Sequence, residues 1–292
     1  ECKQSRQTSI QCYDTHLSAQ YYRRAIVIDA LRSELDKDIE HSEIYVVAQP
    51  IVAQGKPQWD YFEILARWNS DVLGAISPLE FIEAAEQSGL IIELGERIIE
   101  LACQAKIKLE HGLGYRVRLG INCSAHEINN ANRYVQHLLH TLGKYGFNAE
   151  DFTIEMTETV LLSRINEVKT TLDKLRLLGF SIALDDFGTG YSSLNYIHTY
   201  PIDCIKIDAT FVRNMLSNES SESVVWLIIQ LANKLHVSLI AEGVESEEAL
   251  QKLYSMGCKK IQGFYFSTPK EPEELVEGIK ALTNIDSQVS NG

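Results

Sequence analysis

The chain has 292 residues, a length that suits one large domain and that α/β barrels often reach. Its formal charge of −13 argues against attraction to duplex nucleic acid or to anionic lipid, although a phosphorylated small substrate can bind through cations. Six cysteines without Cys-x-x-Cys or zinc-ligand spacing indicate reduced, buried thiols. No apolar run approaches about 20 residues, so no membrane span is expected.

The first 40 residues predict a linker followed by a helix. The chain begins with Glu1 instead of Met, so we expect either a cytoplasmic protein or the cytoplasmic part of a longer, membrane-anchored one. Residues 1–19 are polar and unpatterned, which is typical of a linker. Residues 21–37 carry apolar side chains along one side of a helical period and predict an amphipathic helix.

Two strand-like runs follow at residues 43–52 and 61–67. The turn signal Gly55-Lys56-Pro57 separates them, and this short connection predicts an antiparallel hairpin. A helix then opens at Ser77, with Ser77 as N-cap, Pro78 in the first turn and Glu80 placed to complete a capping box. It is expected to break at Gly89, before a second helix over residues 93–110.

Beyond this point, apolar strand-like runs alternate with helical stretches. The strand-like runs are 117–122, 152–156, 181–185, 204–208, 238–242 and 260–263. With the hairpin they make eight, and this alternation predicts a (β/α)8 TIM-like barrel with one antiparallel strand near the N-terminus. An open doubly wound sheet is the alternative, although no nucleotide-type glycine fingerprint supports it. We expect the barrel to occupy residues 41–285 and a disordered tail to occupy 286–292.

Residues 181–193 place two adjacent carboxylates, Asp185 and Asp186, at the end of a strand and before a glycine-rich turn. Adjacent carboxylates repel each other, and burying either one unpaired is costly. A bound divalent cation would supply the missing charge, and the glycines would let the following backbone turn sharply beside it. A solvated turn without function remains the alternative for this pair alone.

Other strands also end on polar residues, and in a (β/α)8 barrel these ends converge on one mouth. The strand-end residues are Asn122, Glu155, Asp185, Asp186, Lys206, Glu242 and Gln262, while Glu63 lies within the second strand of the hairpin, where alternation can point it inward. An all-oxygen set matches what Mg²⁺ or Mn²⁺ prefers, and the absence of histidine from it argues against zinc. This set comprises Glu63, Asn122, Glu155, Asp185 and Asp186.

Seven short motifs surround these residues: Glu63-Ile64-Leu65-Ala66-Arg67-Trp68, Asn122-Cys123-Ser124, Glu155-Met156-Thr157-Glu158, Asp185-Asp186-Phe187-Gly188-Thr189-Gly190, Lys206-Ile207-Asp208, Glu242-Gly243-Val244-Glu245 and Gln262-Gly263-Phe264. In these motifs and in their order, the sequence resembles the EAL family of bacterial cyclic di-GMP phosphodiesterases from about residue 45 to 269. Two departures are visible: Ile64 replaces the middle Ala of the triplet that names the family, and Ala48 stands where a Tyr often precedes Gln49-Pro50.

The resemblance implies hydrolysis of cyclic di-GMP to linear pGpG with two Mg²⁺ or Mn²⁺ ions. By this likeness, one ion is held by Glu63, Asn122, Glu155 and Asp185, and the second by Asp185 with Asp186. The resemblance gives catalytic roles to three further residues: Lys206 stabilises or orients the attacking water, Glu242 supports the second ion or acts as base, and Gln262 orients water or substrate.

Substrate contacts are expected from Gln49 and from Arg67, whose guanidinium would clamp a phosphate. Glu158 resembles the family residue that anchors the loop at 185–193, with a simple helix cap as the alternative. Residues 191–200 match a region that often contributes to dimerisation in this family, so a homodimer is a further expectation. Two other functions remain open: a receptor that binds cyclic di-GMP without cleaving it, and a metal-dependent hydrolase of another phosphate ester.

Overall fold

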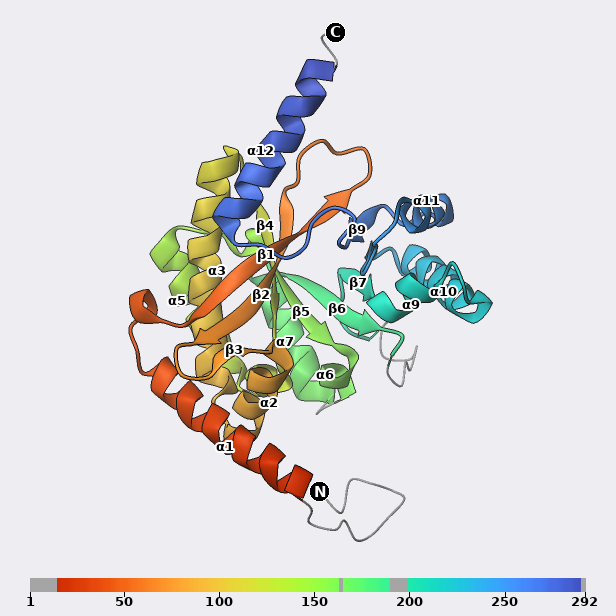
Figure 1. The fold of residues 1–292 in the computed structure, drawn as a ribbon. Coiled ribbons are helices and arrows are strands. Elements are labelled where there is room, and N and C mark those ends of the chain that lie inside the picture. Colours follow the sequence, from red (N-terminus) through yellow and green to blue (C-terminus); the bar gives the residue numbers. More distant parts are fainter. Residues whose placement is uncertain (1–14, 163–164, 190–198, 290–292) are drawn as a thin grey trace.

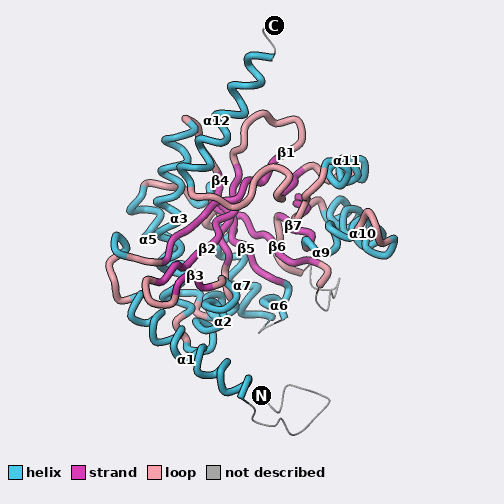
Figure 2. The backbone as a smooth tube through the Cα atoms, in the orientation of Figure 1, coloured by secondary structure: helices cyan, strands magenta, loops and turns pink. Residues whose placement is uncertain are grey.

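The computed structural model describes residues 15–162, 165–189 and 199–289, which form a closed barrel of strands surrounded by helices (Figures 1 and 2). The strands are β1 (Ile44–Ala53), β2 (Tyr61–Ser70), β3 (Gly74–Ile76), β4 (Arg118–Asn122), β5 (Phe152–Thr157), β6 (Ser181–Phe187), β7 (Cys204–Ile207), β8 (Ser238–Ala241) and β9 (Lys260–Gln262). Their order is β1-β9-β8-β7-β6-β5-β4-β2-β3, and an additional β1–β2 pairing closes the barrel. The predicted (β/α)8 fold is therefore confirmed, and the open-sheet alternative is wrong.

Strand β1 runs antiparallel to both of its neighbours, β2 and β9, as the hairpin predicts. From β2 through β4 to β9 the barrel strands are parallel. The short strand β3 pairs antiparallel with the far end of β2 and stands outside the barrel order; the sequence patterns did not predict it. The C-terminal ends of the parallel strands therefore share one mouth.

Helices cover the outside of the barrel (Figure 2). They are α1 (Thr15–Leu35), α2 (Pro78–Ser88), α3 (Ile91–Leu113), α4 (Ala125–Asn129), α5 (Ala131–Tyr145), α6 (Glu158–Leu162), α7 (Ile165–Leu177), α9 (Ala209–Asn214), α10 (Glu219–Leu235), α11 (Glu247–Met256) and α12 (Pro272–Val289), with short 3-10 turns η1 (Ile39–His41) and η2 (Ala149–Asp151). No helix in the described ranges is both long and apolar enough to cross a membrane.

Both ends of the chain differ from expectation. Helix α1 starts at Thr15, inside the stretch expected to be a linker, and it buries Val27 and Leu31 completely while packing beside α2 (Figure 1). The first helix is thus packed on the barrel because its apolar side contributes to the core. At the other end, α12 continues through Val289, although a tail was expected from residue 286. The division into domains itself stays a prediction.

The start of α2 follows its sequence signal in part. The Ser77 side chain accepts a hydrogen bond from the Glu80 backbone N–H at 3.2 Å, so the predicted N-cap is present. The Glu80 carboxylate accepts instead from Arg23 Nε of α1 at 2.7 Å, so the capping box is only half formed. A side-chain ion pair to another helix has replaced the local bond, and it ties α1 to α2.

A small apolar cluster lies inside the barrel, apart from the large core between strands and helices. We call it the floor cluster; it consists of Ile51, Tyr61, Ala183, Cys204 and Ile240. Each member lies two residues from a predicted site residue on the same strand, so alternation puts both on the inner face. The described cysteines are buried free thiols, as expected, while Cys2 and Cys12 lie outside the described residues.

Candidate active site

Each of the eight barrel strands brings one predicted site residue to the same level of the barrel interior. We call this set the polar layer; in strand order it is Gln49, Glu63, Asn122, Glu155, Asp185, Lys206, Glu242 and Gln262. Glu242 directly follows β8, and the others lie within their strands. The convergence expected from the strand ends is therefore present, because parallel strands end at one mouth and alternate side chains face inward.

Lys206 lies at the centre of this layer, and its side chain is 0% exposed. Its Nζ lies 2.5 Å from Glu155 Oε2 and 2.8 Å from Glu242 Oε1. The same nitrogen lies 3.2 Å from Glu63 Oε2 and 3.3 Å from Asp185 Oδ1. One cation thus faces four carboxylates, and the layer holds more negative than positive charge.

The charge surplus shows in the ionisation of the acids. Burial raises the pKa of Glu155 to about 8 in spite of Lys206, and the charges of Glu63 and Asp185 add to the rise. Burial likewise raises the pKa of Asp185 and, to well above its usual value, that of Glu242. A buried ammonium alone does not compensate these groups, so additional positive charge would favour their ionised forms.

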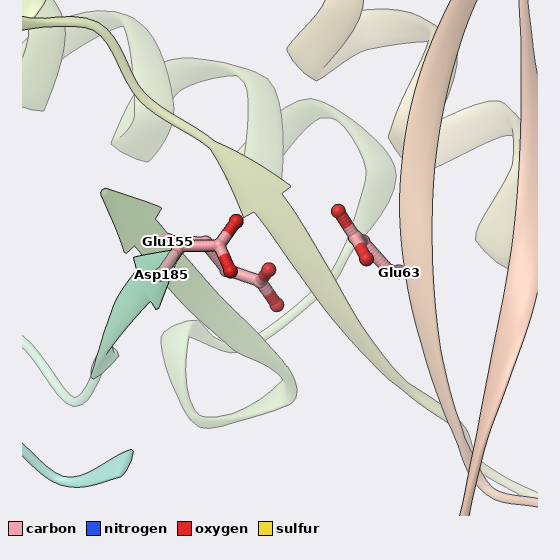
Figure 3. A group of neighbouring side chains, drawn as sticks. All are labelled: Glu63, Glu155 and Asp185. Atoms are coloured by element: carbon pink, nitrogen blue, oxygen red, sulfur yellow. The ribbon is translucent and has the colours of Figure 1, made fainter. Parts of the chain in front are cut away.

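Figure 3 shows Glu155 and Asp185 side by side, with Glu63 beside them. One oxygen from each of the three lies within 4.8 Å of the others, which is the spacing of ligands around one cation. Asp185, Asp186 and Glu242 form a second group of the same kind, and Asp185 belongs to both. The donor set is all oxygen and carries the charge surplus, so it fits two hard divalent cations such as Mg²⁺ or Mn²⁺.

Amide side chains fix Glu63 on two sides. Asn122 Nδ2 donates to Glu63 Oε1 at 3.0 Å, and Gln262 Nε2 donates to Oε2 at 2.6 Å and to Gln49 Oε1 at 3.0 Å. Burial would raise the pKa of Glu63, but the charge of Lys206 and these hydrogen bonds outweigh it and hold the pKa below its usual value. Gln262 Oε1 is buried without a hydrogen-bond partner among the described residues, so it can accept a bond from a water or a ligand.

The turn after Asp185 has an unusual backbone. Asp186 has φ of 53°, a conformation that non-glycine residues rarely adopt and that is often found at functional sites. Burial, and then the charge of Asp185, raise the pKa of the Asp186 carboxyl to about 6. Gly188 has φ of 104°, and a Cβ there would lie 2.9 Å from the Phe211 ring, so this position requires glycine.

Glu158 contacts this turn directly. Its Oε1 accepts a hydrogen bond from the Gly188 backbone N–H at 2.8 Å, across 30 residues of sequence. Glu158 is also the first residue of α6. The contact supports the anchoring interpretation over a simple helix cap, at least for the part of the loop through Thr189. The remainder of that loop, and most of the region expected to support a dimer, lies at 190–198, outside the described residues.

A cavity of about 200 Å³ opens above the polar layer, with Gln49, Glu63, Asp185, Glu242 and Gln262 in its wall. Arg67, the expected phosphate clamp, is not among the described residues that line it. Arg67 lies farther out along β2, where its Nη1 donates to the Ala66 carbonyl at 2.8 Å. Its role in binding substrate stays a prediction.

The two departures from the family pattern lie away from the site. Ala48 and Ile64 are directly paired across β1 and β2, and both are buried in the core between the strands and the helices. Because side chains alternate along a strand, they point to the opposite side from Gln49 and Glu63. Neither change touches the polar layer.

The sequence model of the EAL domain matches residues 32–269. The chain belongs to the EAL domain family. NbdA of Pseudomonas aeruginosa, named as a cyclic di-GMP phosphodiesterase, is 32% identical over 269 residues, which cover 90% of this chain and 34% of NbdA. The signaling protein YkoW of Bacillus subtilis is 35% identical over 245 residues, 84% of this chain and 30% of YkoW. The EAL domain described here thus spans about a third of these relatives.

Solved structures of EAL proteins share this fold. The EAL enzyme Bd1971, in its cAMP- and cyclic di-GMP-bound form, gives a TM-score of 0.82 at 29% identity over 91% of this chain and 70% of its own. The PaMucR phosphodiesterase in complex with c-di-GMP gives 0.78 at 30% identity over 86% of this chain and 99% of its own.

Sequence patterns missed several residues that shape the site of this EAL domain. Tyr61 lies beneath Glu155, and Gly120 lies directly against it. Arg213 and Phe264 line the cavity at its rim. Tyr61 and Gly120 each precede a predicted ligand by two residues on the same face, so alternation along the strand could have identified them. Nothing in the sequence places Arg213 there, because its position depends on how α9 packs beside the loop after β8.

Proposed function

We propose that this EAL domain hydrolyses cyclic di-GMP to linear pGpG with Mg²⁺ or Mn²⁺, two ions per site. The observation that carries the proposal is the charge surplus of the polar layer, where Glu63, Glu155, Asp185 and Glu242 surround the single ammonium of Lys206. A phosphodiester is an anion, and such a layer repels it unless cations intervene. The names of NbdA and of the PaMucR complex support cyclic di-GMP as the substrate.

In this proposal, Glu63, Asn122, Glu155 and Asp185 hold one ion. The second is held by Asp185 and Asp186, and Glu242 lies close enough to support it. When bound, such ions supply positive charge to the phosphodiester and make a nearby water more acidic.

The other side chains handle the water and the substrate. Hydrolysis to pGpG forms a bond from the water oxygen to phosphorus and breaks the bond to the 3′-oxygen, which gains a proton. Lys206 Nζ orients the water and stabilises developing negative charge. Glu242, ionised when cations supply the missing charge, accepts the proton of the water or supports the second ion. Gln262 orients water through its free Oε1, and Gln49 and Arg67 bind the substrate.

The proposal also covers the location of the chain in the cell, its ligand and its assembly. The chain acts in the cytoplasm, as a free protein or as the cytoplasmic part of a longer one. Cyclic di-GMP is its small-molecule partner, and a homodimer is the proposed assembly. Sedimentation of the purified chain with and without cyclic di-GMP would test the assembly, and a single species at the monomer mass in both would contradict it.

The decisive experiment incubates the purified chain with cyclic di-GMP and either Mg²⁺ or Mn²⁺ and separates the products by chromatography. We expect pGpG, no product after chelation, and inhibition by Ca²⁺, whose larger, flexible coordination shell fits poorly where near-octahedral geometry is needed. Glu63→Gln is the matched negative control and should stay folded. Binding without product would instead identify a receptor, and turnover of another phosphate ester would identify a different hydrolase.

A further inference from the structure

The two oxygens of the Glu155 carboxylate are held by different groups. Glu155 is 0% exposed, and its Oε2 accepts from Lys206 Nζ at 2.5 Å. Its other oxygen, Oε1, accepts from the hydroxyl of Tyr61 at 3.3 Å. The roles expected for the polar layer account for Lys206 but not for Tyr61, which lies one level deeper in the barrel.

The contacts of its ring fix the position of Tyr61 independently of its hydrogen bond to Glu155. It belongs to the floor cluster, is 5% exposed, and its ring lies 5.0 Å from the Arg118 guanidinium of the neighbouring strand β4. A phenol keeps its proton at neutral pH, and a carboxylate oxygen only accepts, so the Tyr61 hydroxyl donates to Glu155. The ring of Tyr61 packs in the apolar floor cluster, and its hydroxyl contacts the polar layer.

Strand β4 confines the same oxygen from another side. A Cβ built on Gly120 would lie 1.8 Å from Glu155 Oε1 and 2.7 Å from its Cδ. Real Cβ atoms do not approach so closely, so the carboxylate lies where a side chain of β4 would otherwise be. Oε1 is therefore enclosed between the backbone of β4 and the hydroxyl of β2, and Oε2 is directed toward Lys206.

We infer that Tyr61 is a positioning residue for the cation site: its hydroxyl holds Glu155 Oε1, so that Oε2 stays directed toward Lys206 Nζ, which Glu63 and Asp185 also contact. The inference rests on the cation binding proposed above. A carboxylate that is held by a hydrogen bond loses less freedom when a cation binds, and partners of this kind are worth about 10- to 100-fold in metal affinity.

The test is Tyr61→Phe, which removes the hydroxyl but keeps the ring and its contact with Arg118. Calorimetric titration of Mn²⁺ into the purified chain should show binding about 10- to 100-fold weaker than in the parent protein. Turnover of cyclic di-GMP should fall at low Mn²⁺ and recover at saturating Mn²⁺. The matched control is Ile240→Val, which loosens the same floor cluster from β8, a strand that is not a neighbour of β5, and should bind Mn²⁺ like the parent.

The outcomes separate this inference from the proposed function. If the parent binds Mn²⁺ and Tyr61→Phe binds it equally well, the positioning role is wrong and the proposed function stands. If Ile240→Val weakens Mn²⁺ binding as much as Tyr61→Phe does, the effect comes from packing and the inference is also wrong. If the parent itself binds no Mn²⁺, the proposed metal site fails and the inference fails with it. Should Tyr61→Phe not fold, Gly120→Ala provides the second variant, because it displaces Oε1 from the other side and should weaken Mn²⁺ binding.

Discussion

Two lysines among the described residues, Lys106 and Lys206, are completely buried, and they have opposite surroundings. Lys106 of α3 lies 2.5 Å from Glu110 Oε1 and 3.6 Å from Asp151 Oδ2, and it also donates to the Val117 carbonyl. Arg116 pairs with Asp151 at 2.8 Å. This cluster has two bases and two acids, so its charges balance. Aromatic rings close it, with Lys106 Nζ 4.9 Å from the centre of the Phe147 ring.

Lys206 has the opposite arrangement, because four carboxylates lie within 3.3 Å of its Nζ and no second base is paired with them among the described residues. Burial lowers the pKa of this ammonium, but the carboxylates outweigh burial and raise it well above its usual value. A balanced cluster around a buried lysine is complete without a ligand. In an unbalanced cluster, the acids stay ionised only when further cations bind. The comparison therefore distinguishes a structural cluster from a functional site.

The largest effect is expected from Asp185→Asn, since Asp185 belongs to both groups of acids. Removing its charge takes a ligand from each cation, and we expect turnover of cyclic di-GMP to fall on the order of 10³-fold or more. Asp186→Asn should lose activity as well but less metal affinity, because Asp186 belongs to only one group. Mn²⁺ titrations of both variants measure the difference, and equal losses of affinity would mean that Asp185 is not shared.

Replacing each lysine by Met tests the comparison itself. Lys106→Met leaves buried acids without their partner and should lower the free energy of unfolding by about 3 kcal/mol. Its turnover per folded molecule should not change, because Lys106 lies outside the site. Lys206→Met should lower turnover by about 100-fold, less than Asp185→Asn, because it removes charge stabilisation but no ligand. Mn²⁺ should raise its melting temperature, since added cations replace the lost charge.

Denaturant titrations and melting curves with and without Mn²⁺ check both variants. Mn²⁺ should also stabilise the parent and Lys106→Met, because both keep the proposed cation site. If Mn²⁺ stabilises these two but leaves the melting temperature of Lys206→Met unchanged, added cations do not replace the lost charge and the comparison is wrong. The parent protein provides the reference for each curve.

The same two clusters show how much of the site can be predicted from the sequence. The polar layer could be predicted because each of its members ends a strand or alternates with its neighbours, and a barrel brings such positions together. The partners of Lys106 could not be predicted, since they come from a helix, a 3-10 turn and the residue before β4, and no local pattern specifies how these segments pack. For the same reason, the sequence did not predict that the Glu80 side chain would pair with Arg23 instead of completing the capping box. Tyr61 differs, because alternation along β2 could have placed it on the inner face below Glu63, although alternation does not show that its hydroxyl contacts Glu155 of β5.

A third buried group, Glu127, extends the comparison to a carboxylate that has no basic partner among the described residues. Burial raises the pKa of Glu127 to about 7, although it accepts from the Ser124 N–H and hydroxyl, both at 2.7 Å. A raised pKa in the folded state means that the stability from this group is present below its usual pKa of 4.5 and is lost as the pH rises through about 7.

Glu127→Gln mimics the protonated acid and should remove that loss. We expect the variant to match the parent near pH 4 and to exceed its free energy of unfolding by about 3 kcal/mol at pH 8, at 1.36 kcal/mol for each pKa unit. Urea titrations across this range measure the difference. A constant difference at every pH would show that Glu127 does not titrate between these values.

The smallest effect is expected at Glu158, which belongs to neither group of acids and acts through the Gly188 N–H. Glu158→Gln keeps an acceptor for that hydrogen bond but weakens it, because an amide oxygen carries less charge than a carboxylate. The Asp185–Asp186 turn should then be held less firmly, and the Mn²⁺ concentration for half-maximal activity should rise about tenfold. Activity should recover at saturating Mn²⁺, since binding of the ion restores the geometry by mass action.

The matched control for Glu158→Gln is Glu247→Gln, the same change at the exposed first residue of α11. It alters the net charge equally but lies outside both groups of acids, so its Mn²⁺ dependence should match the parent. A parallel shift in both variants would assign the effect to overall charge. If Glu158→Gln keeps the Mn²⁺ dependence of the parent, Glu158 has no anchoring role and serves only as the first residue of a helix. The unusual backbone at Asp186 would then be stabilised by the bound ions.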